Sequence, residues 1–238
     1  MAEVQSLLAR FTGRIGMFAG LLVLVGPLLA HLRVVAPMSG FLSFLLGGLL
    51  SLVAVICGVI AILRGGAGQL VWRGMIPGLL VIAIFFIQAS RSAKHPRIND
   101  ITTDTDSPPQ FVAASTLEGN VGRDLQYPGQ SFAQQQRTGY PDLEPLRLEV
   151  SPDAAFTRVR TAAHTMPDWE ITREDANARV IEGVATSWLF HFKDDFIIEV
   201  RARDGGSVVQ MRSKSRDGKG DVGANAARIK VFFESLRG

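Results

Sequence analysis

The chain has 238 residues, of which 25 are lysine or arginine and 22 are aspartate or glutamate. These charges are unevenly divided, because residues 1–95 hold seven basic residues and one acidic residue (net +6), whereas residues 96–238 hold 18 and 21 (net −3). The basic residues of the first part flank apolar runs, as expected of segments that meet lipid headgroups. The larger part is slightly acidic, which argues against binding to nucleic acid.

Three stretches within the first 90 residues lack charged side chains and predict membrane-spanning helices at about residues 15–32, 40–63 and 74–90. The middle run is long enough alone to cross about 30 Å of hydrocarbon. The other two reach the length if flanking arginines extend into the headgroups. A cleaved signal peptide is the alternative for the first run, but two more spans follow and no small-residue cleavage site is evident. We therefore expect residues 1–94 to form a transmembrane helical region.

The predicted spans carry no acidic or basic residue at depth. Transporters and proton pumps usually need such a group, so an anchor or a partner-binding bundle is favoured over a conduction path. Gly16 with Gly20, and Gly74 with Gly78, have the spacing of four that permits close helix approach, although glycine is common in membrane helices. Cys57, the single cysteine, is expected to pack as a small apolar residue.

The remainder predicts a soluble α+β domain at residues 146–238, preceded by an extended or irregular lead-in at 95–145 that is rich in turn-forming residues. Ser151 and Pro152 predict a helix start, and Asp204-Gly205-Gly206 predicts a tight hairpin. The expected order is strand, helix, four strands and helix. This order predicts an antiparallel sheet with its helices on one face. The expected strands lie at 146–150, around Trp169–Ile171, and at 180–186, 196–202 and 207–213, and the last helix at 222–236.

Residues 218–223 match the G-x-G-x-x-G pattern of dinucleotide-binding turns. That interpretation needs a second parallel strand with an acidic residue about 20 positions further on, and we expect no such strand before residue 238. Asp221 would also lie among the phosphates and repel them. We therefore expect a strand-to-helix turn in which Asp221 caps the next helix, and we expect no nucleotide.

The segment RSKSRDGKGDVGANAARI at residues 212–229 resembles the signature of the family catalogued as domain of unknown function 1499. The resemblance extends over about residues 96–237 and includes NDITTD at 99–104. The family's name states no activity. Because similar domains occur in bacterial envelope proteins and plastid-related proteins, the resemblance implies an exported or lumenal location.

The same segment supplies the candidate site. Two arginines and two serines alternate near a strand end, three polar residues share one helix face, and two aspartates begin the neighbouring strand. These residues are Arg212, Ser213, Ser215, Arg216, Asp221, Asn225, Arg228, Asp194 and Asp195. In a structural interpretation the arginines pair with Asp194, Asp195 or Asp221 and form a clamp. In a functional interpretation the arginines, the serines and a helix N-terminus bind a phosphate, a carboxylate or a lipid headgroup.

Enzymatic activity is left open and is the less favoured possibility. Asp194 and Asp195 are adjacent strand residues that point to opposite faces, so without a bulge they do not flank one substrate. Ser213 and Ser215 lack a recognisable base, and we assign no catalytic residue. The four histidines lack metal-ligand spacing, so we expect neither a metal nor a cofactor.

These observations lead to two functional hypotheses. The first is a membrane-anchored envelope protein whose soluble domain binds a partner protein or an anionic small molecule or lipid. The alternative is an envelope enzyme acting on a lipid or a cell-wall precursor. Basic flanks of the spans are equally divided between the two sides. The resemblance therefore supports the expected location, the inner (cytoplasmic) membrane with the soluble domain on the periplasmic side. For Trp188, Phe190 and Phe192, core packing is the first explanation and a lipid-binding mouth the second.

Overall fold

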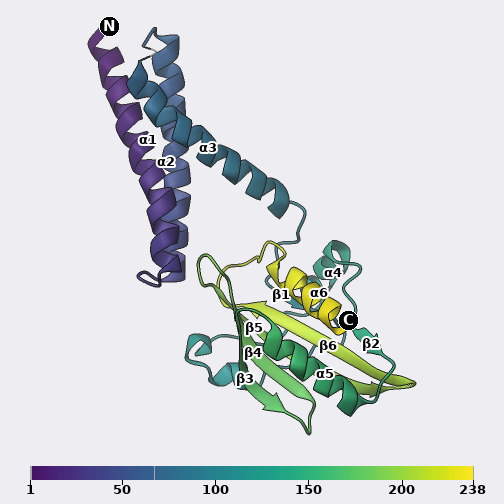
Figure 1. The fold of residues 1–238 in the computed structure, drawn as a ribbon. Coiled ribbons are helices and arrows are strands. Elements are labelled where there is room, and N and C mark those ends of the chain that lie inside the picture. The colour runs from purple at the N-terminus through teal and green to yellow at the C-terminus, as the bar shows by residue number, and fades with distance from the viewer. Residues whose placement is uncertain (1, 67, 238) are drawn as a thin grey trace. The chain divides into compact units, whose positions relative to one another are not determined.

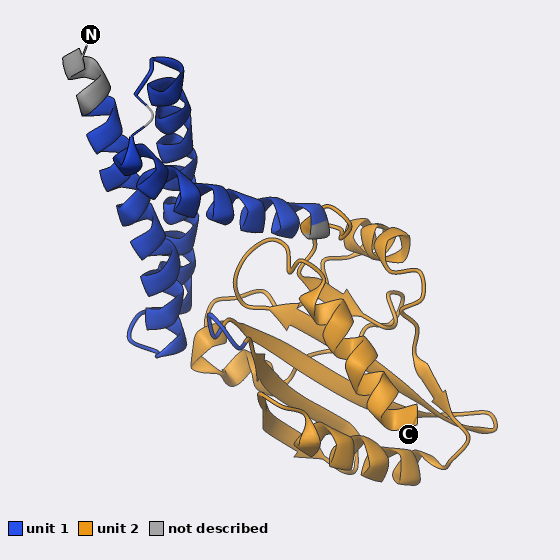
Figure 2. Cartoon of the chain, turned by 45° about the horizontal axis from the view of Figure 1, so that its top comes forward, with its two compact units in different colours: residues 1–91, 188–191 blue, residues 92–187, 192–238 orange. Residues whose placement is uncertain are grey.

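The computed structural model describes residues 2–66 and 68–237. The chain forms two compact units, which Figure 2 shows in two colours. Unit 1 comprises residues 1–91 together with residues 188–191. Unit 2 comprises residues 92–187 and 192–238.

Unit 1 contains the helices α1 (Ala2–His31), α2 (Pro37–Leu63) and α3 (Gln69–Ser92), shown in Figure 1. Their segments Leu7–His31, Pro37–Leu63 and Gln69–Ser90 are long and apolar enough to cross a membrane. The three predicted helices are confirmed, and each begins earlier in the chain than predicted.

The outward surface of unit 1 consists largely of apolar side chains. Leu24, Leu63 and Phe86 are 72%, 81% and 72% exposed. A continuous apolar surface of this kind is unusual for a protein in water. It suits contact with lipid chains, which supports membrane insertion of these helices.

The helices of unit 1 approach one another at small residues. A Cβ atom on Gly16 would overlap the backbone of Gly74, and a Cβ atom on Gly74 would overlap the backbone of Thr12. One glycine of each sequence pair, Gly16 of the first and Gly74 of the second, therefore lies at the contact between α1 and α3. Gly78 faces Ser51 and Val55 of α2 in a similar way.

Unit 2 is an α+β domain with an antiparallel sheet, as predicted. Its strand order is β1-β6-β5-β4-β3, and β2 also pairs with β6. The pairing is antiparallel throughout. The strands are β1 (Asp100–Thr102), β2 (Leu146–Leu148), β3 (Trp169–Asp175), β4 (Val180–Thr186), β5 (Lys193–Arg203) and β6 (Gly206–Ser215).

Helices α5 (Pro152–Thr165) and α6 (Ala224–Arg237) pack on one face of this sheet (Figure 1). The Ser151 hydroxyl accepts a hydrogen bond from the Ala154 backbone N–H and caps α5, as predicted. The apolar core between the sheet and the helices includes Phe156, Val159, Ile181, Phe196, Ile198, Val200, Met211, Ile229, Phe232 and Phe233. Alternation along β5 places Phe196, Ile198 and Val200 in this core, whereas Ala202 is exposed near the hairpin.

The lead-in at 95–145 contains more regular structure than its composition predicts. It includes β1, the short 3₁₀ helices η1 (Ala113–Thr116) and η2 (Glu118–Asn120), and α4 (Gln130–Gly139). A three-residue strand shows too little alternation to be predicted, and α4 is rich in glutamine. Residues 103–127, which we call the covering segment, contact the sheet face opposite the helices, as the contacts below show.

Candidate functional site

The residues of the RSKSR motif do not form one cluster, because they point to both faces of the sheet. Ser213 and Ser215 face α6, whereas Arg212 and Lys214 face the covering segment. This division follows from the alternation of side chains along a strand. The motif therefore builds two polar networks separated by the thickness of the sheet.

The first network joins β6 and β5 to α6. Ser213 Oγ donates to Asn225 Oδ1 (2.6 Å), and Asn225 Nδ2 donates to Ser215 Oγ (2.9 Å). The Arg228 guanidinium donates to Ser213 Oγ (2.9 Å) and Asn225 Oδ1 (2.6 Å), and forms an ion pair with Asp194 (2.5 Å). These polar atoms are thus bonded to one another at one end of the apolar core.

Asp221 takes no part in an ion pair with the motif arginines. Its carboxylate accepts hydrogen bonds from the backbone N–H groups of Gly223 (2.9 Å) and Asn225 (2.8 Å). It therefore caps the start of α6, as the sequence predicts. In the turn before α6 the backbone φ is 55° at Val222 and 85° at Gly223, so both residues are in the left-handed region.

The second network is centred on Arg212, whose side chain is fully buried. Its Nε and Nη2 atoms donate to the two carboxylate oxygens of Asp100 at 2.8 Å each. The guanidinium also donates to the carbonyl oxygens of Pro109 (3.1 Å) and Leu125 (2.8 Å). Lys214 Nζ forms a further ion pair with Asp100 (2.8 Å). Arg212 thus fastens two points of the covering segment to the sheet.

Aromatic rings complete the surroundings of Arg212. Its guanidinium carbon lies 4.8 Å from the centre of the Phe111 ring and 5.5 Å from that of Tyr127. Such cation–π contacts gain strength when they are shielded from water. Burial, reinforced by the negative charge of Asp100, raises the pKa of Tyr127 to about 12.

Asp195 lies on the same face and binds a second part of the covering segment. Its buried carboxylate pairs with Arg216 (2.6 Å) and accepts a hydrogen bond from Asn120 Nδ2 (3.0 Å). Arg123 approaches it to 3.6 Å and donates to the Ser215 carbonyl oxygen (2.8 Å). Asp194 and Asp195 therefore serve different faces, as strand geometry predicts.

Glu182 of β4 is a third buried anion on this face. Its carboxylate accepts hydrogen bonds from the backbone N–H groups of Val112, Ala113 and Ala114 at 3.0–3.2 Å. The Arg173 guanidinium also donates to it, at 3.1 Å. Hydrogen bonds to Glu182 and Asp175 raise the pKa of Arg173. The anion satisfies the free N–H groups that begin η1.

The sequence analysis named the residues of the network that faces α6, but only some of the residues that face the covering segment. Arg212 pairs with Asp100 and not with Asp194, Asp195 or Asp221, which corrects the predicted pairing. The residues that the sequence analysis missed are Asp100, Lys214, Asn120, Arg123, Arg173 and Glu182. A lone glutamate inside the apolar run of β4 was a usable signal, because charged residues are seldom fully buried unless they are paired.

The residues that the structure describes include no group of three or more His, Cys, Asp or Glu side chains that could hold a metal ion. His95 contacts Tyr140, with Nδ1 and the hydroxyl oxygen 3.3 Å apart. Burial, and secondly the charge of Asp221, raises the pKa of Tyr140 to about 12. His164 bonds Glu174 at the surface (3.0 Å).

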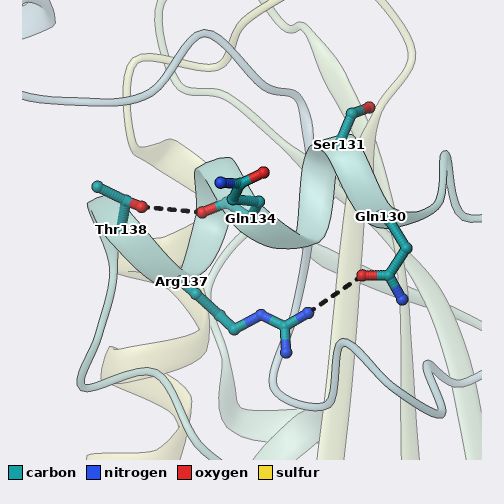
Figure 3. A pocket seen from close by; sticks show the side chains of 5 residues that line it. All are labelled: Gln130, Ser131, Gln134, Arg137 and Thr138. Atoms are coloured by element: carbon teal, nitrogen blue, oxygen red, sulfur yellow. Dashed lines mark hydrogen bonds between the residues drawn. The ribbon is translucent and has the colours of Figure 1, made fainter.

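Two open hollows border α4 and differ from the buried networks. The first, of about 650 Å³, is lined by Gln130, Ser131, Gln134, Arg137 and Thr138. Figure 3 shows these side chains along the helix, with the Arg137 guanidinium directed toward Gln130. The second, of about 530 Å³, is lined by Ala93, Lys94, His95, Pro96, Gln134, Gln135, Thr138 and Gly139. Neither lining contains a carboxylate.

A third hollow of about 500 Å³ lies on the covered side of the sheet, and its charges are mixed. Arg201 of its lining forms an ion pair with Glu199 (2.7 Å). Arg173 forms one with Glu182. Because opposite charges in and beside its wall already compensate each other, this hollow offers less to an ionic ligand than the two beside α4.

Comparison with known families agrees with the fold. The sequence model of a family described as a protein of unknown function, DUF1499, matches residues 100–236, more than half of the chain. No curated protein matches the chain. The matched range contains the sheet, the covering segment and both polar networks.

Proposed function

The chain belongs to the DUF1499 family, whose function is unknown, so we infer its role from the geometry of this chain. We propose that it is a membrane-anchored binding module that holds an anionic lipid headgroup in the hollows beside α4. The observation that carries this proposal is the lining of those hollows, which joins cations and neutral hydrogen-bond donors without a carboxylate.

The chemistry of the lining favours a phosphate-bearing ligand. Lys94 and Arg137 provide positive charge, and the glutamine amides with the Ser131 and Thr138 hydroxyls provide neutral donors. Arg137 approaches Asp106 only to 3.5 Å, and both side chains are at least half exposed. An exposed pair of this kind is worth less than about 1 kcal/mol. The guanidinium therefore remains available to an incoming phosphate.

The connection to α3 supplies the second argument. The apolar segment of α3 ends at Ser90, and Lys94 follows four residues later. Four residues span at most about 14 Å, and headgroups occupy about 5–8 Å on each side of the hydrocarbon. If α3 spans a membrane, the second hollow cannot lie far from the lipid headgroups.

The three arginines of the sequence-based site are better explained as parts of a structural clamp. Arg212, Arg216 and Arg228 each pair with a buried carboxylate, and their side chains are 0%, 11% and 13% exposed. A ligand would have to displace those carboxylates from a site closed to water. We therefore assign the nine residues of the sequence-based site to fastening α6 and the covering segment to the sheet.

The binding proposal is tested on the full chain in detergent with equal amounts of phosphatidylglycerol and phosphatidylcholine. Native mass spectrometry counts the lipids that stay bound. We expect preferential retention of phosphatidylglycerol. We also expect a Lys94→Gln, Arg137→Gln double variant to lose about thirty-fold in retention, because each of the two lost contacts weakens binding by roughly 1 kcal/mol.

The matched control is a Lys219→Gln, Arg203→Gln double variant, which removes the same charge from exposed positions elsewhere in unit 2. It should retain phosphatidylglycerol like the natural chain. Equal loss in both double variants, or no preference in the natural chain, would refute the headgroup site.

We place the protein in the inner (cytoplasmic) membrane with unit 2 on the periplasmic side. Three spans put the two ends of the chain on opposite sides, and the likeness to exported domains favours the outer side for the second part. A reporter fused after Gly238 that is active only outside the cytoplasm should be active. Activity of a cytoplasm-specific reporter there would reverse the orientation.

A further inference from the structure

The loop between β4 and β5 exposes aromatic and aliphatic side chains. Trp188 is 71% exposed and Leu189 is 37% exposed. Core packing, the first explanation from the sequence, is therefore wrong for Trp188. Exposed tryptophan is favourable where one part of the ring meets an apolar phase and the N–H meets water.

The loop has a defined conformation. The Ser187 backbone N–H donates to the Phe192 carbonyl oxygen (2.8 Å), and the Phe192 N–H donates to Ser187 Oγ (2.9 Å). His191 turns the chain in a left-handed conformation, with a φ of 58°. Two hydrogen bonds across its base thus hold the apolar residues at the tip.

Residues 188–191 belong to unit 1, where they contact the ends of two predicted spans. His31 Nδ1 lies 3.0 Å from the Trp188 carbonyl oxygen, and His191 Nε2 lies 2.9 Å from the His31 carbonyl oxygen. The Trp188 and His31 rings are 5.0 Å apart between centres. His31 is the last residue of α1 and of its apolar segment. Trp188 is thereby placed at the level where that span ends.

Phe190 contacts residues deeper in the apolar region. Its ring centre lies 5.5 Å from that of Phe41 and 6.3 Å from that of Phe44 on α2. Phe44 also stacks on Phe85 of α3 (4.7 Å). Phe44 is seven residues beyond Pro37, where α2 begins, which corresponds to about 10 Å along a helix axis. The loop therefore reaches from the end of α1 to the first turns of an apolar helix.

The order of the spans independently allows this placement. If α1, α2 and α3 each cross the bilayer once, the turn between α1 and α2 and everything after α3 lie on the same side. The loop and the end of α1 can therefore meet at one membrane surface. Arg33 follows the end of α1 by two residues and Lys193 follows Phe190 by three; both are exposed, as is usual for cations next to an interfacial segment.

We infer that Trp188, Leu189 and Phe190 insert into the boundary between headgroups and acyl chains, as an additional attachment of the protein to the bilayer. The occupant of this apolar surface is lipid. The inference goes beyond headgroup binding beside α4 and shares no residue with those hollows. Insertion adds apolar contact area to the anchor and holds the β4–β5 loop at the membrane surface.

The test uses the full chain in phosphatidylcholine vesicles, with Cys57→Ala as background and an environment-sensitive fluorophore on Trp188→Cys. We expect blue-shifted emission and quenching by lipids that carry a spin label on the upper acyl chain. The control is the same fluorophore on Val121→Cys, because Val121 is an apolar residue of unit 2 that is 77% exposed. It should emit as in water and escape quenching by the lipids.

A second measurement uses the natural tryptophans, so that its result does not depend on a cysteine variant that folds incorrectly. Dibrominated lipids should quench part of the natural tryptophan emission, and Trp188→Phe should remove a component that is quenched. Water-like emission at position 188, or loss of only an unquenched component in Trp188→Phe, overturns the inference. Shielding from water without quenching by lipid also overturns it, because the loop would then be covered by protein.

Discussion

Both faces of the sheet in unit 2 contribute buried side chains, and the two sets are buried by different means. On the face under α5 and α6, apolar residues such as Phe196, Ile198 and Met211 pack against apolar helix residues. On the face under the covering segment, Arg212 and Asp195 have fully buried side chains and bind charged or polar partners.

The difference lies in how each face tolerates change. Apolar burial is nondirectional, so a core of similar volume can be filled in several ways. A buried ion pair has already lost its hydration, and its partner compensates for that loss only in a suitable geometry. The polar face therefore specifies one position for the covering segment, and removal of a single partner there should be costly.

The largest effect is expected at Asp100, which compensates both Arg212 and Lys214. Asp100→Ala leaves two cations in a buried site and should lower the free energy of unfolding by about 3–5 kcal/mol. Urea unfolding of the full chain in detergent, followed by tryptophan fluorescence, to which Trp169 contributes because it packs against the core, measures this change. Asp106→Ala, which removes an exposed pair, should cost less than about 1 kcal/mol. An equal loss of unfolding free energy in the two variants would contradict the proposed difference between buried and exposed ion pairs.

The next effect is expected at Glu182, which accepts hydrogen bonds from three backbone N–H groups and from Arg173. Glu182→Gln replaces one acceptor oxygen by an NH₂ group that faces other donors. The same unfolding measurement should show a loss of about 2–3 kcal/mol. Glu174→Gln, at a partly exposed glutamate paired at the surface, serves as the control and should change stability by less than about 1 kcal/mol.

The chain has two tyrosines, Tyr127 and Tyr140, and the pKa of each phenol reports how far it is buried. Each has a pKa of about 12 in the folded protein, raised from 10.0 chiefly by burial. Above pH 10 the unfolded chain loses these protons first, so stability that is fully present below pH 10 is lost as the pH rises through about 12. Tyrosinate absorbance should therefore show a native midpoint near 12 and a denatured midpoint near 10. A native transition with a midpoint near 10 would show that the phenols are open to water.

The smallest effect concerns the turn into α6, on the helix-covered side. Val222 is a β-branched residue with a φ of 55°, a conformation that favours glycine. Val222 is also 56% exposed, so its side chain contributes little packing. Val222→Gly should therefore raise the free energy of unfolding by about 1 kcal/mol. Destabilisation would mean that the side chain makes a contact that outweighs the backbone strain.

The sequence predicts the helix-covered face far better than the covered polar face. Alternation at Phe196, Ile198 and Val200 and helical spacing at Ile229 and Phe233 identify the core correctly. These signals are local, because the periods of strands and helices are set by backbone geometry.

The polar face depends on partners far apart in the chain. Asp100 and Arg212 are separated by 112 positions, and no local period links them. The sequence predicts that the strand of Arg212 ends at residue 213, whereas β6 continues to Ser215, and the polar residues Lys214 and Ser215 are buried. The family resemblance included Asp100 within residues 99–104, yet it could not identify Arg212 as the partner.

Hydrogen exchange of the full chain tests the central claim, that the buried charges Arg212, Asp195 and Glu182 hold the covering segment closed against the polar face. The amides of Val112, Ala113 and Ala114, which donate to Glu182, should exchange as slowly as the interior amides of β6. Exchange within seconds at these three amides, while β6 stays protected, would contradict the claim and reopen this face as a binding site.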